Sequence, residues 1–223
     1  MPPLGHLYIV ATPIGNTLDI TLRALKVLSE VDAIICEELR QGSRLLKKLD
    51  ITARELIVLN EHNESTQAAE IVSRLLNGQS IALISDCGTP VFADPGYFLI
   101  RQAIQAGLDV TPVPGPSSLS AILSILDFKL EKFVFGGFLP RTPVQRNQEL
   151  KRLRSLNMPI ILMDTPYRMV TLLDEVSRVF GKKQHVTLAC NLTMSDEKIY
   201  RGSVLDVRNN LKTRKAEFVL VIH

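Results

Sequence analysis

The stretch that decides the fold is LISDCGTPVFADPG, residues 83–96. It joins an apolar, strand-like run at residues 80–84 to a helical pattern of apolar residues that begins near Tyr97. Between them lie two Asp, two Gly and two Pro, which is more turn-forming chemistry than a connection needs. Loops that follow the strands of open α/β sheets are where such proteins bind their ligands. The stretch therefore predicts a ligand-binding loop.

Strand-like and helix-like segments alternate on both sides of this stretch as far as residue 113. The expected strands are residues 7–10, 33–36, 55–59, 80–84 and 109–113. Strict alternation predicts a parallel sheet with helices on both faces. The rigid tripeptide PGP at residues 114–116 predicts a domain boundary. We therefore expect one α/β domain over residues 1–114 and a second over residues 115–223.

The second half carries a different pattern. Strands are expected near residues 132–135, 160–163, 185–189, 197–201 and 218–222, with a basic helix at 143–156 and an amphipathic one at 169–180. Two of these strands, at 185–189 and 197–201, follow each other without a helix. They predict a hairpin, so the second domain should have a mixed sheet.

Composition limits the classes of protein but names no partner. The 223 residues are 46% hydrophobic and 22% charged, with a net charge of +3, as in ordinary folded proteins. The cysteines Cys36, Cys87 and Cys190 form no C-x-x-C pair, which argues against a zinc site or a disulfide framework and favours the cytoplasm. No apolar run is long enough to predict a membrane span, and we expect no metal.

Familiar nucleotide and hydrolase signatures are missing: there is no G-x-G-x-x-G after the first strand, no P-loop, no H-E-x-x-H and no G-x-S-x-G. Instead, Pro- and Gly-rich loops follow three apolar strands, at residues 12–16, 86–96 and 114–118. Such loops let a backbone approach a ligand closely. Each loop alone is also explained as a tight turn, but a parallel sheet would bring all three to one edge.

A family resemblance rests on blocks spread through the chain in order: TPIGN at 12–16, EHNE at 61–64, SDCGTP at 85–90 with DPG at 94–96, PVPGPS at 112–117 and GFLP at 137–140. Together they resemble the branch of the tetrapyrrole methylases that methylates ribose in small-subunit ribosomal RNA. The resemblance implies two α/β domains, S-adenosyl-L-methionine bound in the cleft between them, and a homodimer. It places cofactor contacts at Pro13, Cys87, Gly88, Thr89, Phe92, Ser117, Ser118, Met163 and Ala216.

Several polar blocks depart from the pattern of this family. Its E-D-T-R is EELR at residues 37–40, its F-Y-E-S-x-H-R is LMDTPYR at 162–168, and its R-E-L-T-K is CNLTM at 190–194. Two alternatives therefore stand beside an RNA ribose methyltransferase. One is a methyltransferase that acts on a small tetrapyrrole-like acceptor, and the other is a non-catalytic relative that binds cofactor or RNA.

Ribose methylation would be an in-line transfer of a sulfonium methyl group to a hydroxyl oxygen, assisted by a base that takes the hydroxyl proton. Asp86 is the first candidate for that base and Glu38 the second, while Glu61 and His62 also follow a predicted strand. For each of these residues, a role in a cap or turn is the competing explanation.

RNA binding would need positive charge in one place. Arg141, Arg146 and Arg152 lie in and after the GFLP block and are the candidate RNA contacts, with Phe138 beside them as a side chain that could stack on a base. A second basic group lies at residues 212–215. The competing explanation is an ordinary solvated surface.

Overall fold

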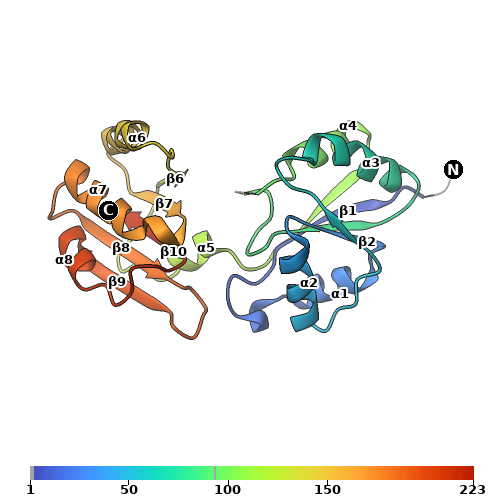
Figure 1. Ribbon diagram of the computed structural model, residues 1–223, viewed down its shortest axis with the longest axis horizontal. Helices are drawn as coiled ribbons and strands as arrows, with labels where there is room; N and C mark the ends of the chain where they lie inside the picture. The colour runs from blue at the N-terminus through green and yellow to red at the C-terminus, as the bar shows by residue number, and fades with distance from the viewer. Residues whose placement is uncertain (1–2, 93) are drawn as a thin grey trace. The chain divides into compact units, whose positions relative to one another are not determined.

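The computed structural model describes residues 3–92 and 94–223 (Figure 1). The chain divides into two compact units, one that ends at Ser117 and one that begins at Ser118. The sequence predicted a boundary after residue 114. The structure divides the chain three residues later, after Ser117, so the PGP tripeptide lies in the first unit. There, an added Cβ on Gly115 would lie only 3.2 Å from the side chain of Ala11, which shows how closely this turn packs on the loop after the first strand.

The first unit contains a five-stranded sheet in the order β3-β2-β4-β1-β5. All of its pairings are parallel, as the alternating pattern predicted. The strands are β1 His6–Val10, β2 Ala33–Cys36, β3 Leu56–Val58, β4 Ile81–Ile84 and β5 Asp109–Val113.

Helices cover both faces of this sheet. Their bounds are α1 Leu22–Glu30, α2 Leu39–Lys48, α3 Glu64–Leu76 and α4 Tyr97–Gln105, with a short 3₁₀ helix η1 at Thr17–Asp19. Alternate residues of β2 divide the core: Ile34 packs with the buried residues of α1 and α2, and Ile35 packs with those of α3 and α4. The predicted parallel sheet with helices on both faces is confirmed (Figure 1).

Two helix starts show how local chemistry sets the boundaries. Thr21 caps α1, because its Oγ1 accepts the N–H of Ala24 at 3.1 Å. Helix α2 begins at Leu39 and so takes in Arg40 of the EELR block. The charged residues after β2 thus enter a helix, and Glu38 is its N-cap residue.

The second unit contains a five-stranded sheet in the order β6-β7-β10-β8-β9. Only β6 and β7 pair in parallel, and β8 and β9 form the predicted antiparallel hairpin, so the mixed sheet is confirmed. The strands are β6 Val134–Phe138, β7 Ile160–Asp164, β8 His185–Cys190, β9 Lys198–Ser203 and β10 Phe218–Ile222.

One face of this sheet packs against α6, α7 and α8, and the other packs against α5. These elements are α5 Ser118–Leu123, α6 Pro143–Ser155, α7 Met169–Phe180, α8 Val204–Asn209 and the 3₁₀ helix η2 Pro166–Arg168. Strand β6 continues through two glycines to Phe138, beyond its predicted end at residue 135. Its register on β7 shifts between Phe135 and Gly137, where Gly137 has a φ of +60°. No helix in the described part of the chain is long and apolar enough to cross a membrane.

Candidate functional site

The five strands of the first sheet run in parallel, so the loops after their carboxyl ends meet at one edge of the sheet. We call this the first-sheet edge; it is formed by residues 11–16, 37–38, 59–63, 85–92, 94–96 and 114–117. The connection after β1 crosses one face and the connection after β4 crosses the other, and these two strands are neighbours. This is the topological switch point at which open α/β sheets bind ligands.

The loops after β1 and β4 are joined backbone to backbone. The N–H of Thr12 donates to the carbonyl of Gly88 at 2.9 Å, and the N–H of Gly88 donates to the carbonyl of Thr12 at 3.1 Å. Thr12 is fully buried, and its Oγ1 donates to the carbonyl of Ser85 at 3.1 Å. These bonds hold the predicted cofactor loops in one arrangement that leaves Gly88 at their junction.

Gly88 cannot be replaced without strain. Its φ of +82° is unfavourable for residues with a side chain, and an added Cβ would lie 3.3 Å from Cγ2 of Ile14 and 3.9 Å from the carbonyl oxygen of Pro116. The hydroxyl of Thr89 also donates to that carbonyl, at 3.4 Å. The loops after β1, β4 and β5 therefore converge on a position without a side chain.

The long loop after β4 is held from within and from a neighbouring helix. Ser85 Oγ donates to Asp94 Oδ2 at 2.5 Å and accepts the N–H of Cys87 at 3.2 Å. The buried carboxylate of Glu64, at the start of α3, accepts the N–H groups of Gly96 and Phe98, each at 2.8 Å. Glu64 thus occupies the amino end of α4, where a negative charge is favoured.

Sequence reasoning included Glu64 in the EHNE block and gave it no role of its own. Its signal was present but weak: an acid in the first turn of α3 looks like an ordinary cap residue. Its partners lie 32 and 34 residues away, so only the folded chain shows that it shapes the predicted cofactor loop.

Among the expected cofactor residues of this unit, Pro13 and Gly88 are buried, while Cys87, Thr89 and Phe92 are exposed. Ser117 is half-buried at the end of the unit. The first-sheet edge therefore brings these expected residues into neighbouring loops and leaves part of them open to a ligand.

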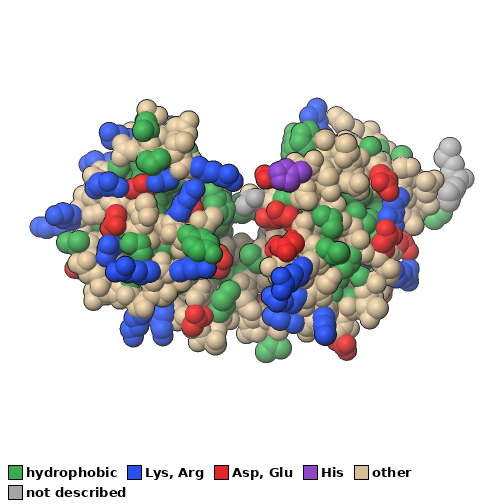
Figure 2. All heavy atoms as spheres, viewed as in Figure 1, with side chains coloured by type: hydrophobic (Ala, Val, Ile, Leu, Met, Phe, Trp, Pro, Cys, Tyr) green, Lys and Arg blue, Asp and Glu red, His purple; other side chains and the backbone are tan. Residues whose placement is uncertain are grey.

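Acidic side chains gather at the first-sheet edge. Burial raises the pKa of Glu37, and so do the nearby charges of Asp94, Asp86, Glu61 and Glu38, in that order. These carboxylates come from the ends of β2, β3 and β4, and Figure 2 shows acidic side chains close together on the first unit. Such an edge attracts a cation and repels phosphate.

Asp86, the first candidate base, belongs to this acidic group. Partial burial of its carboxyl raises its pKa, and the charges of Glu38 and Asp94 raise it further. A hydrogen bond from the backbone of Glu38 opposes the shift. The other two candidates, Glu61 and His62, carry strongly exposed side chains, which lie 3.7 Å apart.

In the second unit, a corresponding edge is formed by the carboxyl ends of β6, β7 and β8 and by the amino ends of β9 and β10. We call it the second-sheet edge. Met163, in β7, and Ala216, just before β10, are both buried there, while Ser118 begins α5. Next to Met163, the carboxylate of Asp164 is buried, and its Oδ1 accepts the N–H of Thr165 at 2.7 Å.

The three candidate RNA contacts have different surroundings. Arg141 is exposed, and Arg152 is exposed and paired with Glu149 at 2.6 Å. Arg146 is only 6% exposed and makes two 2.6 Å hydrogen bonds to Glu175 of α7. The structure thus gives Arg146 an internal ion pair in place of the expected surface position.

Arg146 acts on the loop that carries another candidate. Its Nη1 donates to the carbonyl of Arg141 at 3.0 Å, and Glu175 raises the pKa of its guanidinium. The reason for the changed role is a partner 29 residues away on another helix, which helical periodicity could not reveal. Arg146 is therefore a support for the loop after β6.

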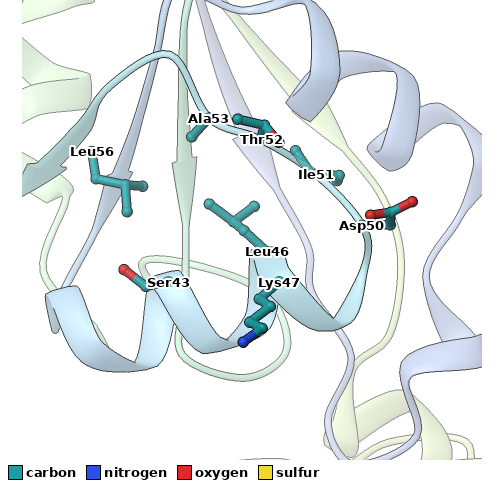
Figure 3. A pocket seen from close by; sticks show the side chains of 8 residues that line it. All are labelled: Ser43, Leu46, Lys47, Asp50, Ile51, Thr52, Ala53 and Leu56. Carbon is teal, nitrogen blue, oxygen red and sulfur yellow. The ribbon is translucent and has the colours of Figure 1, made fainter.

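A pocket of about 330 Å³ lies in the first unit, and its lining includes no residue of the first-sheet edge (Figure 3). The residues that line it belong to the later part of α2, the connection after it, and the start of β3: Ser43, Leu46, Lys47, Asp50, Ile51, Thr52, Ala53 and Leu56. None of the expected site residues lines this pocket. Across residues 3–92 and 94–223, no group of three or more His, Cys, Asp or Glu side chains is placed to hold a metal ion.

The fold defines a protein of two α/β units, the first of which gathers Pro- and Gly-rich loops at one edge of its parallel sheet. Comparison with known proteins makes the class specific. Residues 6–207 match the family described as Tetrapyrrole (Corrin/Porphyrin) Methylases. The chain belongs to this family and is a methyltransferase.

Among curated relatives, proteins named "Ribosomal RNA small subunit methyltransferase I" match over nearly the whole chain. The one from Xylella fastidiosa (strain Temecula1) is 40% identical over 98% of this chain and 81% of its own length. The one from Escherichia coli O157:H7 is 39% identical over 98% of this chain and 77% of its own length.

Solved structures support the fold. A uroporphyrin-III-C-methyltransferase from Thermus thermophilus aligns with a TM-score of 0.65 and 19% identity, covering 98% of this chain and 94% of its own. A second structure, of the native form of uroporphyrin III C-methyl transferase from the same organism, gives a TM-score of 0.68 at 16% identity and covers 97% of both chains. At these identities the likeness concerns the fold alone.

Proposed function

We propose that this protein uses S-adenosylmethionine to methylate RNA of the small ribosomal subunit, at a ribose 2'-hydroxyl. The observation that carries the proposal is the likeness, at 39–40% identity over 98% of the chain, to proteins named for methylation of that RNA. The first-sheet edge supports the choice of cofactor, and the charges of the second unit support the choice of substrate.

S-Adenosylmethionine supplies a methyl group on a positively charged sulfur. The first-sheet edge suits such a molecule, because closely packed turns let backbone atoms approach it and the acidic side chains favour its positive charges. We assign it contacts with Pro13, Gly88 and the residues around Gly88 that the resemblance named: Cys87, Thr89, Phe92 and Ser117. In the second unit, the cofactor contacts of Ser118, Met163 and Ala216 remain predictions from the family resemblance.

Asp86 is our choice for the base that receives the ribose hydroxyl proton. The oxygen takes the methyl group, the sulfur keeps the bonding electrons and becomes a neutral thioether, and the carboxylate takes the proton. A raised pKa makes Asp86 a stronger base than an ordinary aspartate, and its side chain is exposed at the end of β4. Glu38 is the second choice and acts on Asp86 through its charge.

The acidic first-sheet edge is a poor surface for RNA, so we place the phosphate contacts on the second unit. Arg141 and Arg152 are exposed there, as are Lys212, Arg214 and Lys215. Transfer to a small tetrapyrrole-like acceptor is the alternative that this basic surface disfavours. A homodimer and a cytoplasmic location stay predictions.

The test combines calorimetric titration of S-adenosylmethionine with a transfer assay. The protein is incubated with radiolabelled cofactor and small ribosomal subunits from cells that lack their own version of the enzyme. Label in the RNA, located at a 2'-O-methyl nucleotide by mass spectrometry, supports the proposal. Cofactor binding without RNA labelling contradicts the proposed substrate, and an absence of cofactor binding contradicts the proposal as a whole.

A further inference from the structure

Tyr167 is the most exposed aromatic side chain of the second unit among the described residues, at 75%. It lies in η2, directly after β7. The ammonium group of Lys215 lies 4.0 Å from the centre of its ring. Lys215 belongs to the turn before β10, the strand that pairs with β7, so the contact joins two neighbouring strand ends. Its cation–π attraction holds the ring at the surface.

The backbone under Tyr167 is well defined. Pro166 begins η2, and the N–H of Arg168 closes its turn on the carbonyl of Thr165 at 2.9 Å. One guanidinium nitrogen of Arg168 lies 3.5 Å from Oδ1 of Asp164, whose side chain is only 2% exposed. The guanidinium of Arg168 is therefore held at the end of β7, while the ring of Tyr167 is held by Lys215.

Asp164 also has an unused acceptor. Its Oδ2 is buried and has no hydrogen-bond partner in the described part of the chain. Buried oxygens without a partner are uncommon, and Arg168 forms an ion pair with the other oxygen of the same carboxylate. A bidentate contact between Arg168 and Asp164 would satisfy both carboxylate oxygens and fix the position of the guanidinium.

A second exposed aromatic residue lies on the next strand. Phe138 ends β6, is 53% exposed, and is in register with Met163 of β7. The exposed Arg141 follows it, in the loop that Arg146 supports. The second-sheet edge thus combines exposed aromatic rings with Lys and Arg side chains. Proteins use these two features to bind single-stranded nucleic acid.

We propose that Tyr167, Arg168 and Lys215 form a platform for one unpaired nucleotide of the substrate RNA. The base stacks on the ring face of Tyr167 opposite Lys215, and the two cations contact flanking phosphates. The nucleotide is unpaired because a base inside an RNA helix presents no free face to a side chain. This inference rests on the proposed function for its choice of RNA, and it adds the residues and the form of RNA that they recognise.

Fluorescence gives the most direct test, because the chain contains no tryptophan. Tyr167→Trp introduces a single tryptophan at the platform. Phe133→Trp introduces one just before β6, at the end of that strand opposite to Phe138. The probe is a mixed-sequence single-stranded RNA of about 12 nucleotides, within the range that one single-strand site covers. We expect this RNA to quench the Tyr167→Trp emission strongly and the Phe133→Trp emission little. Equal quenching of both, or quenching of neither, overturns the platform.

Binding measurements then separate stacking from charge. We expect Tyr167→Ala to weaken binding of the same RNA about tenfold, while Tyr167→Phe keeps it within about twofold because the ring remains. Lys215→Ala should weaken binding more than Lys183→Ala, a matched change of an exposed lysine at the opposite end of the second sheet. Affinity for S-adenosylmethionine should not change in any of these variants. Unaltered RNA affinity in Tyr167→Ala contradicts the inference.

The outcome can be told apart from failure of the proposed function. If wild-type protein labels small-subunit RNA but Tyr167→Ala binds RNA and transfers methyl groups normally, the platform is wrong and the function stands. If wild-type protein does not label that RNA but binds single-stranded RNA through Tyr167, the platform stands and the proposed substrate is wrong.

Discussion

The first-sheet edge and the second-sheet edge differ in the groups that they expose. The first-sheet edge is organised by backbone: the paired Thr12 and Gly88 and the turn at Gly115 leave little room for side chains, and its charges are negative. The second-sheet edge presents long side chains, such as Tyr167 and Lys215. The contrast fits the division of labour that we propose, in which backbone shape would hold the small cofactor and exposed cations and rings would hold the RNA.

The strongest test of this contrast is at Gly88. We expect Gly88→Arg to weaken S-adenosylmethionine binding by about a thousandfold or more, because the added side chain occupies the junction of three loops. Gly107→Arg is a matched control: Gly107 has a φ of +74°, similar strain, but open space around it. Calorimetric titration measures both affinities, and circular dichroism checks folding. If the two variants bind the cofactor equally well, the first-sheet edge is not the cofactor site.

The second test concerns the buried support of the second-sheet edge. Arg146→Met removes both short hydrogen bonds of the buried Glu175 carboxylate, leaves it only the exposed Arg178 at 4.0 Å, and should destabilise the protein by about 3–5 kcal/mol. The double variant Arg146→Met/Glu175→Leu should recover much of this loss. Urea denaturation followed by circular dichroism measures the change. Arg152→Met, which breaks an exposed ion pair on the same helix, should leave the midpoint almost unchanged.

A catalytic test comes next in size. We expect Asp86→Asn to lower kcat for methyl transfer about a hundredfold, because the amide cannot accept the hydroxyl proton. Cofactor affinity should fall much less than kcat, since the substitution keeps the shape of the side chain and removes only one of several negative charges at this edge. Steady-state assays at saturating cofactor give kcat, and titration gives the affinity. A kcat equal to that of the wild type would remove Asp86 as the base.

The smallest expected effect is a change in pH dependence. Asp86 must be ionised to act as a base, so activity falls as pH decreases through its raised pKa. Removing the Glu38 charge with Glu38→Gln lowers that pKa, and the acid limb of the kcat profile should therefore move to lower pH. An acid limb that moves to higher pH, or does not move, contradicts the proposed coupling of these two carboxylates.

The sequence predicted what depends on local chemistry. Alternating segments predicted the parallel sheet, and the adjacent strands at residues 185–189 and 197–201 predicted the hairpin. It missed the true end of β6, because the two glycines there follow their tertiary contacts more than their usual preferences.

Strand order was beyond such reasoning. Nothing in the spacing of the segments shows that β4 lies between β2 and β1, although this placement brings Gly88 beside Thr12. Likewise, the sequence placed Arg146 with surface cations, and only the packing of α6 on α7 paired it with Glu175.

By itself, then, the sequence determined the alternation of elements, the turns rich in glycine and proline, and the motifs of the family, since each depends on neighbours along the chain. The tertiary structure decided which loops meet, which carboxylates shift each other's pKa, and whether an arginine is a surface cation or a buried support. These properties depend on distances between residues tens of positions apart, and only the packed sheet and its helices set those distances.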